Sequence, residues 1–327
     1  MPSTGSSERT RLGYAYTLVA GISFSFTALF STFLKNLGVP SIEQGFFRIS
    51  FTAVFFGIVL LLRSSLRHID RTDVKFFVIN GLFGICLSIT AYLSSIALGT
   101  PLAVAITLSY LQPMFSVILA RVFLSETITR MRVVAVVTSI IGASIVSGIW
   151  EVFSAAMQIN IVGVLLATLN GFFYSVYVIV GRLSGSSKSY HFETTMFYSF
   201  FFGLLWMAPI WLLISEFIKE PIVTGFVVAF LPEAWTYLVL IAVVATIIPY
   251  GLLALGLRNL KASKAGILLL IEPVCVMIMQ VFVLGQPLAP LALVGAALVL
   301  SATILVSFEG RSSKFSAKRA KGRECKS

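Results

Sequence analysis

The sequence predicts an all-α polytopic membrane protein with ten transmembrane helices, arranged as two inverted five-helix repeats. Apolar residues make up 58% of the 327 residues and charged residues only 11%, and a soluble chain of this length cannot bury that much apolar surface. The apolar residues fall in segments of about 20, the length at which a helix crosses a bilayer. An apolar segment with a central proline occurs twice, 160 residues apart. These three observations define the fold class.

The predicted spans follow one another through short connections, which leave no room for a separate soluble domain. They cover 13–34, 42–62, 74–96, 101–124, 130–149, 160–182, 192–214, 234–256, 263–284 and 288–308. Because five is an odd number, the second repeat enters the membrane from the opposite side. We divide the chain into an N-terminal tail 1–12, a first repeat 13–149, an external connection 150–159, a second repeat 160–308 and a basic tail 309–327.

The distribution of basic residues predicts the orientation. Three of the 24 Lys and Arg (Lys35, Arg48 and Lys219) fall on one side of the predicted spans, which leaves 21 on the side of the two termini. By the positive-inside rule, both termini lie in the cytoplasm of a cell-membrane protein. The same distribution explains the net charge of +11, so we expect a lipid bilayer as partner and no nucleic acid.

The repeat is clearest around two prolines. The segment AVAITLSYLQPMFSVILARVFLSE is echoed by SKAGILLLIEPVCVMIMQVFVLGQ, with Pro113 and Pro273 at matching places. Proline lacks an amide donor and clashes with the carbonyl four residues earlier, so each proline kinks its helix. Each also follows a polar residue, Gln112 or Glu272. A helix break beside a polar side chain within a membrane is typical of a binding site.

Glu272 is the main candidate for function. An ionised carboxylate in lipid is costly, so Glu272 must face a wet cavity, pair with a cation or hold a proton. Two functional interpretations follow: a ligand for a substrate ammonium group, or a carboxylate that couples transport to a proton or another ion. The structural alternative is a hydrogen bond that supports the kink. We also expect Pro273 to free the carbonyl of Leu269 as an additional acceptor.

Five further polar residues are candidates for contact with a small-molecule substrate. Four are uncharged, and for each of them an interhelical hydrogen bond, worth about 0.6 kcal/mol, is the alternative. Arg48 would place a cation at the outer mouth, and its alternative is a side chain that snorkels to the interface. The five are Arg48, Tyr110, Gln112, Asn170 and Tyr250.

Several functions have no supporting motif. The sequence holds no HExxH, no paired intramembrane aspartates and no serine–lysine arrangement, so we expect no enzyme activity, catalytic residue, metal or cofactor. It also lacks a nucleotide-binding loop, so a gradient would supply the energy for transport. Small residues every four positions on one span (Ala135, Ser139, Ala143 and Ser147) predict a scaffold helix or the face of a homodimer.

Two longer segments carry a resemblance to a known family. ALGTPLAVAITLSYLQPMFSVILARVFLSE and LRNLKASKAGILLLIEPVCVMIMQVFVLGQ resemble the drug/metabolite transporter superfamily, EamA-type. The resemblance implies a secondary-active transporter that works by alternating access around a central cavity. It further implies export of a small metabolite, such as an amino acid or a related compound. The alternative is a lipid-handling protein of the scramblase kind, or a scaffold that transports nothing.

The two halves differ at one position of this family pattern. Glu126 matches the acid that ends the first half's pattern, whereas Gln286 stands at the corresponding place in the second half. We expect Glu126 to cap the following span near Thr127 and Thr129.

Overall fold

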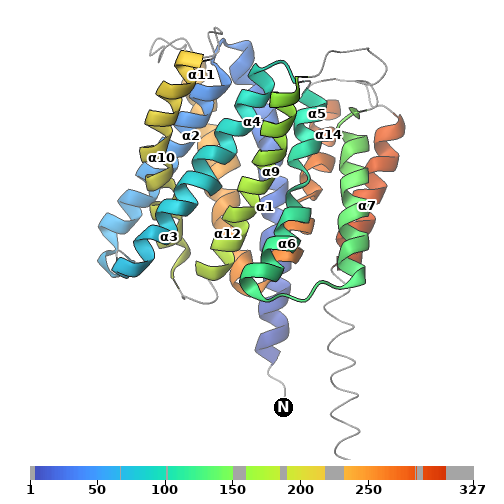
Figure 1. Cartoon of the computed structure of the whole chain (residues 1–327), viewed down its shortest axis with the longest axis horizontal. Coiled ribbons are helices and arrows are strands. Elements are labelled where there is room, and N and C mark those ends of the chain that lie inside the picture. The colour runs from blue at the N-terminus through green and yellow to red at the C-terminus, as the bar shows by residue number, and fades with distance from the viewer. Residues whose placement is uncertain are drawn as a thin grey trace, which may run out of the picture.

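The computed structural model describes residues 4–66, 68–100, 102–149, 160–184, 190–217, 232–283, 285 and 290–306, and the regular structure within them is helical (Figure 1). Gln286, the connection 150–159 and the basic tail lie outside the described residues. Seven helical stretches are long and apolar enough to cross a membrane: Glu8–Asn36, Ile42–Leu62, Arg71–Ile96, Val104–Leu124, Ile161–Arg182, Pro232–Asn259 and Ala262–Phe282. The count of ten spans and their inversion remain predictions.

The helices of the first half run in the predicted order. They are α1 (Thr4–Asn36), α2 (Ser41–Leu62), α3 (Val74–Ile79), α4 (Ser88–Ala97), α5 (Leu102–Ser109), α6 (Gln112–Leu124) and α7 (Arg130–Val146). Two short 3₁₀ turns, η1 (Ser64–Leu66) and η2 (Arg71–Asp73), lie between α2 and α3, and the π-helical segment η3 (Asn80–Leu87) joins α3 to α4.

The second half repeats this order. It contains α9 (Ile161–Arg182), α10 (Phe192–Phe217), α11 (Pro232–Ala242), α12 (Ile248–Asn259), α13 (Ala262–Leu268) and α14 (Ile271–Phe282). A second π-helical segment, η6 (Val243–Ile247), joins α11 to α12. A last apolar helix covers Pro290–Val306.

Polar contacts tie many helix ends together at the end of the bundle where α1 begins, which we call the N face. Tyr14 of α1 donates to the carbonyl of Val306, and Arg182 at the end of α9 donates to the carbonyl of Leu257. The backbone amide of Ala262 donates to Glu126, just beyond α6. The starts of α1 and α13 and the ends of α6, α9 and α12 therefore share this face.

Matching glycines make matching contacts in the two halves. A Cβ atom on Gly21 of α1 would lie 2.5 Å from Cγ2 of Ile271, beside the gap between α13 and α14. A Cβ on Gly171 of α9 would lie 2.9 Å from the carbonyl oxygen of Ser109, beside the gap between α5 and α6. In each half, the absence of a side chain lets the first helix approach the backbone of a broken helix.

The stripe of small residues on α7 is used within the chain. Ala135, Ser139 and Ala143 are fully buried, and α7 approaches the helix Pro290–Val306 so closely that a Cβ on Gly142 would lie 2.7 Å from the carbonyl oxygen of Gly295. Ala143 and Ala135 belong to apolar clusters that include residues of the helix Pro290–Val306. The stripe therefore serves as a scaffold contact between these two helices, which lie side by side at one edge of the bundle (Figure 1).

The two π-helical segments occupy related positions, because adding 160 to residues 83–87 of η3 gives residues 243–247 of η6. A π-helical turn shifts backbone hydrogen bonding by one residue and often marks a functional site. Each segment contacts a polar side chain from another helix. Asn80 of η3 donates to Ser199 of α10 over 2.7 Å, and Thr246 of η6 accepts from Arg48 of α2.

Candidate functional site

Two broken helices position the site. α5 ends at Ser109 and α6 begins at Gln112, while α13 ends at Leu268 and α14 begins at Ile271. The carbonyl of Leu269, which we expected Pro273 to free, accepts the backbone amide of Glu272 over 3.0 Å. The carbonyl of Leu269 is therefore already hydrogen-bonded in a local turn. The carboxylate of Glu272 is the acceptor that remains available for a ligand at this break.

Glu272 lies in the first turn of α14, where the positive end of the helix dipole favours a negative charge. It sits deep in the helix bundle, yet its side chain keeps part of its accessible surface. Within the described part of the chain, its carboxylate has neither a hydrogen bond nor an ion pair. Because buried polar groups are almost always paired, an accessible and unpaired carboxylate at this depth suits a ligand or ordered water.

Arg48 supplies a positive charge close to this carboxylate. It reaches from α2 to η6, where Nε donates to Oγ1 of Thr246 over 3.0 Å and Nη2 donates to the carbonyl of Ala245 over 3.5 Å. The guanidinium interacts electrostatically with Glu272, although the two side chains form no ion pair within 4 Å. The π-helical segment thus holds Arg48 near Glu272 without direct neutralisation.

Four tyrosines complete the site, and each interacts electrostatically with Glu272. Within the described residues their hydroxyl groups have no hydrogen-bond partner. Three of them remain partly accessible, and Tyr250 is 6% exposed. We call the following six residues the central cluster: Arg48, Tyr92, Tyr110, Tyr174, Tyr250 and Glu272.

Aromatic rings pack against the cluster. The ring of Tyr250 meets those of Phe24, Tyr177 and Phe200 edge to face, with centroids 5.0, 4.9 and 5.2 Å away. Tyr174 stacks on Tyr177 with a centroid distance of 6.1 Å. These contacts fix the orientation of the Tyr174 and Tyr250 rings, so their hydroxyl groups are held in place before any ligand arrives.

The structure does not bring all the predicted residues together. The side-chain amide of Asn170 donates to the carbonyl and to Oγ of Ser88, over 2.8 and 3.1 Å. The amide of Gln112 donates to Oγ of Ser116 within α6, over 2.8 Å. Arg48, Tyr110, Tyr250 and Glu272 therefore lie in the central cluster, while the amide groups of Asn170 and Gln112 are used in helix packing.

Sequence reasoning places Tyr92 and Tyr174 on polar-faced spans but does not single them out as candidate site residues. Both lie on spans that carry other polar residues, Ser88 and Thr90 on α4 and Asn170 on α9. A search for tyrosines one or two turns from such residues would have found them.

The contacts of Glu126 also differ from the predicted capping of the following helix, α7. Thr129, not Glu126, caps α7 by accepting the backbone amide of Arg132. Glu126 instead accepts from the backbone amide of Ala262 and the hydroxyl of Ser263, and so caps α13 in the other half. Nη1 of Arg132 lies 3.7 Å from Oε2 of Glu126 and donates to Ser263. Buried charges thus join the two halves at the N face, a contact that local sequence cannot reveal.

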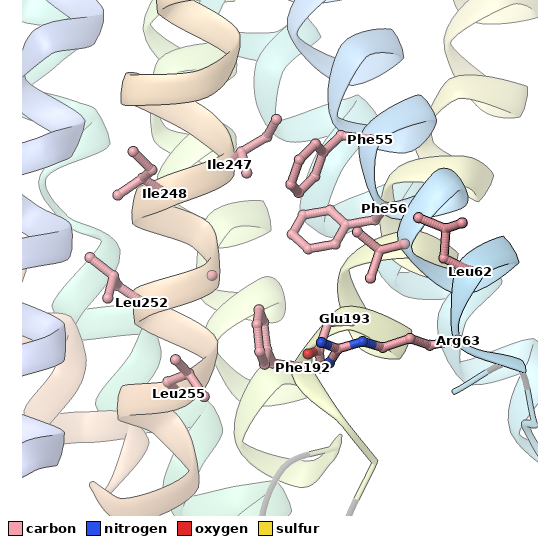
Figure 2. A pocket seen from close by; sticks show the side chains of 12 residues that line it. Phe55, Phe56, Leu62, Arg63, Phe192, Glu193, Ile247, Ile248, Leu252 and Leu255 are labelled. Atoms are coloured by element: carbon pink, nitrogen blue, oxygen red, sulfur yellow. The ribbon is translucent and has the colours of Figure 1, made fainter. Parts of the chain in front are cut away.

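A separate pocket of about 540 Å³ lies between α2 and α12, with the start of α10 beside it (Figure 2). Its lining is mainly apolar and includes Phe55, Phe56, Ile248 and Leu252. No member of the central cluster lines this pocket. We therefore treat the pocket and the cluster as different sites.

Comparison with known proteins agrees with this architecture. The model of the EamA-like transporter family matches residues 11–148 and again residues 161–308. An uncharacterized transporter of Archaeoglobus fulgidus is 23% identical over 279 residues, which is 84% of this chain and 90% of the relative. The uncharacterized transporter YwfM of Bacillus subtilis is 28% identical over 171 residues, 51% of this chain and 53% of that protein.

A solved crystal structure has the same fold, with a TM-score of 0.73 at 17% identity, and the match covers 93% of this chain and 99% of that one. The family model covers most of the sequence in two consecutive copies, one for each half described above. The chain therefore belongs to the EamA-like transporter family, whose members are multi-pass membrane transporters.

Proposed function

We propose that this membrane transporter is a secondary-active exporter of small zwitterionic metabolites, such as amino acids or related compounds. It binds them at the central cluster and moves them across the membrane by alternating access. One observation carries the proposal: Arg48 is bound by Thr246 and Ala245 on η6 and not by Glu272, with which it interacts electrostatically but forms no ion pair within 4 Å. Separated opposite charges deep in a protein are costly. A zwitterion offsets this cost because its ammonium group can meet Glu272 while its carboxylate meets Arg48.

The remaining cluster residues support the same substrate class. The hydroxyl groups of Tyr92, Tyr110, Tyr174 and Tyr250 have no partner in the described residues, so they can donate to a substrate carboxylate or accept from its ammonium group. The rings of Phe24, Tyr174 and Tyr250 offer an apolar surface for the rest of the molecule. A small polar head with an apolar or aromatic side group matches this arrangement.

Alternating access needs a site that opens to one side at a time. α6 and α13, the halves of the broken helices nearer the N face, pack against each other, whereas the described parts of α5 and α14 make hardly any contact. This arrangement supports a state closed at the N face. With the N face in the cytoplasm, as the basic residues predict, the cluster would then face the outside. We assign the outward direction of net transport as part of the proposal.

Glu272 has a second role in this proposal. A proton on Glu272 would remove the negative charge that attracts the substrate ammonium group, so protonation and substrate binding would exclude each other. Such competition is a simple way to couple export to proton entry.

Binding measurements on the purified protein test the substrate class. Thermal unfolding is followed with an amino-acid panel, and each hit is repeated as its N-acetyl derivative and its carboxamide. Because a ligand at 100 times its dissociation constant stabilises by about 2.7 kcal/mol, a hit should give a clear shift. Both derivatives should lose it, and Glu272→Gln should lose it while the control Glu43→Gln keeps it. An equal shift with either derivative would refute recognition of a zwitterion.

Transport direction and coupling need vesicles of known orientation. Substrate efflux from the N-face side should respond to an imposed pH gradient in the wild type and ignore it in Glu272→Gln. Transport that runs only toward the N face would contradict the assigned direction.

A further inference from the structure

The pocket between α2 and α12 has two different ends. Its walls carry Phe55 and Phe56 from α2 and Ile248 and Leu252 from α12. At the end nearer the N face it meets Arg63, which follows the last residue of α2, and Glu193 in the first turn of α10 (Figure 2). The pocket is therefore apolar along its length and carries one basic and one acidic side chain at one end.

The apolar walls continue onto the lipid-facing surface. Three lining residues expose large apolar side chains: Leu62 is 81% exposed, Phe55 45% and Ile248 42%. In a multi-pass membrane protein these side chains contact acyl chains, so the pocket can fill from the bilayer. An acyl chain that enters it replaces lipid contacts with protein contacts and exposes no apolar surface to water.

The polar end of the pocket contains a buried carboxylate oxygen that has no hydrogen-bond donor within the described residues. Oε2 of Glu193 is buried and has no hydrogen-bond partner within the described residues, and Glu193 and Arg63 form no ion pair within 4 Å. Figure 2 shows both side chains directed toward the same end of the pocket. A buried carboxylate oxygen without a donor is costly, so a donor from outside the described chain would be favourable here.

We propose that the pocket binds a phospholipid whose headgroup carries a primary amine, of the phosphatidylethanolamine class. One acyl chain lies between α2 and α12, the phosphate contacts the guanidinium of Arg63, and the ammonium group donates to Glu193. Arginine binds phosphate well through its forked donors. The ammonium group donates to the carboxylate of Glu193, which lines the pocket and whose Oε2 has no donor within the described residues.

Other headgroups fit this end less well. A phosphatidylglycerol headgroup would bring its negative charge to Glu193 without a compensating cation. A phosphatidylcholine headgroup carries the positive charge but has no N–H to donate. The pair Arg63 and Glu193 therefore selects for an amine that still has its protons.

The location gives this lipid a consequence for transport that goes beyond the proposed function. α2 belongs to the first half of the chain and α12 to the second. A lipid held between them contacts both halves at once, so its binding depends on how the halves are arranged. A ligand that binds one arrangement better shifts the population toward it.

Lipid titration of the delipidated protein in detergent tests the proposal. The melting temperature is recorded against phosphatidylethanolamine, phosphatidylglycerol and phosphatidylcholine with identical acyl chains, and native mass spectrometry counts the bound lipids. We expect phosphatidylethanolamine to give the largest shift. Glu193→Gln should raise the lipid concentration for half the shift by about tenfold, the loss of one charge-assisted hydrogen bond. Arg63→Gln should weaken all three lipids.

Two controls separate this site from general effects. Lys75→Gln removes an exposed cation that does not line the pocket, and it should change nothing. Gly251→Leu fills the pocket beside Phe192 and should abolish the shift while the protein still unfolds cooperatively without lipid. An equal response to phosphatidylglycerol, or a full shift in Gly251→Leu, would overturn the proposal. So would a full shift with soluble phosphoethanolamine, because the acyl chain would then be unnecessary.

Discussion

At the scale of single residues, the neighbouring tyrosines Tyr250 and Tyr177 allow the loss of a substrate contact to be distinguished from the loss of a packing contact. The hydroxyl of Tyr250 has no partner in the described residues, whereas that of Tyr177 contacts Sδ of Met196 at 3.6 Å. Both residues are buried, and their rings pack edge to face with centroids 4.9 Å apart. Tyr250→Phe should therefore lower substrate affinity about tenfold, the effect of one lost hydrogen bond, and leave the melting temperature unchanged. Tyr177→Phe should leave affinity unchanged, as measured by substrate titration of thermal unfolding.

Asn170 provides the opposite case. Its amide donates twice to Ser88, so Asn170→Ala should lower the free energy of unfolding by about 0.6–1.5 kcal/mol. Substrate affinity should stay within twofold of the wild type. A variant with wild-type stability and lost affinity would show that the side chain contacts substrate instead. Ser88→Ala is the matched variant, because it removes the hydroxyl partner from the other side.

These residues also show how far sequence reasoning reaches into the site. Glu272 and Arg48 could be predicted as candidates because a charged side chain within an apolar span is energetically costly and is usually kept for a function. Asn170 and Gln112 are also candidates on depth and polarity, but a sequence gives the depth of a side chain and not its direction around the helix axis. Tyr92 and Tyr174 are not singled out from the sequence because each, taken alone, is as readily explained by an interhelical hydrogen bond.

At the scale of elements, the close approach of helices to the two breaks can be tested with matched substitutions. A Cβ on Gly171 would meet backbone atoms, the carbonyl oxygen of Ser109 at 2.9 Å and the amide nitrogen of Gln112 at 3.2 Å. A Cβ on Gly21 would meet mainly the side-chain methyl of Ile271, which can move. Gly171→Ala should therefore cost about 1–3 kcal/mol and Gly21→Ala less. Chemical denaturation of both variants would measure the difference, and equal losses would contradict this account.

The elements were predicted to different degrees. The breaks beside Pro113 and Pro273 follow from local chemistry, because proline removes a donor wherever it occurs. The π-helical segments η3 and η6 have no such signal in the sequence. Their extra residue is accommodated by contacts between helices, such as Asn80 with Ser199 and Arg48 with Thr246, and these depend on the assembled bundle.

At the scale of the whole molecule, buried polar groups join the two halves at the N face. At the N face, Glu126 beyond α6 binds the start of α13, and Arg132 on α7 supports it. The first half is thus tied to the second by buried polar groups. The alternating access that we propose requires these contacts to break, so under that proposal they help to set the balance between the two states.

Glu126→Gln should shift this balance toward opening at the N face. Glutamine keeps the volume but removes the charge that faces the amide of Ala262 and the guanidinium of Arg132. Ser116 on α6 is fully buried and lies against Gly266 of α13, so a single cysteine introduced there reports opening between these helices. After Cys86, Cys275 and Cys325 are replaced, Glu126→Gln should raise the labelling rate of Ser116→Cys by a membrane-impermeant maleimide at least about tenfold, equivalent to roughly 1.4 kcal/mol.

The control for this experiment removes a carboxylate that does not join the halves. Glu8 near the start of α1 lies at the same face, is exposed, and has no hydrogen bond or ion pair within the described residues, so Glu8→Gln should leave the labelling rate unchanged. A saturating substrate that favours the N-face-closed state should slow labelling in Glu126→Gln again, because binding and opening then compete. An unchanged rate in Glu126→Gln would mean that apolar packing of α6 against α13 is sufficient to close the N face, and that Glu126 only caps α13.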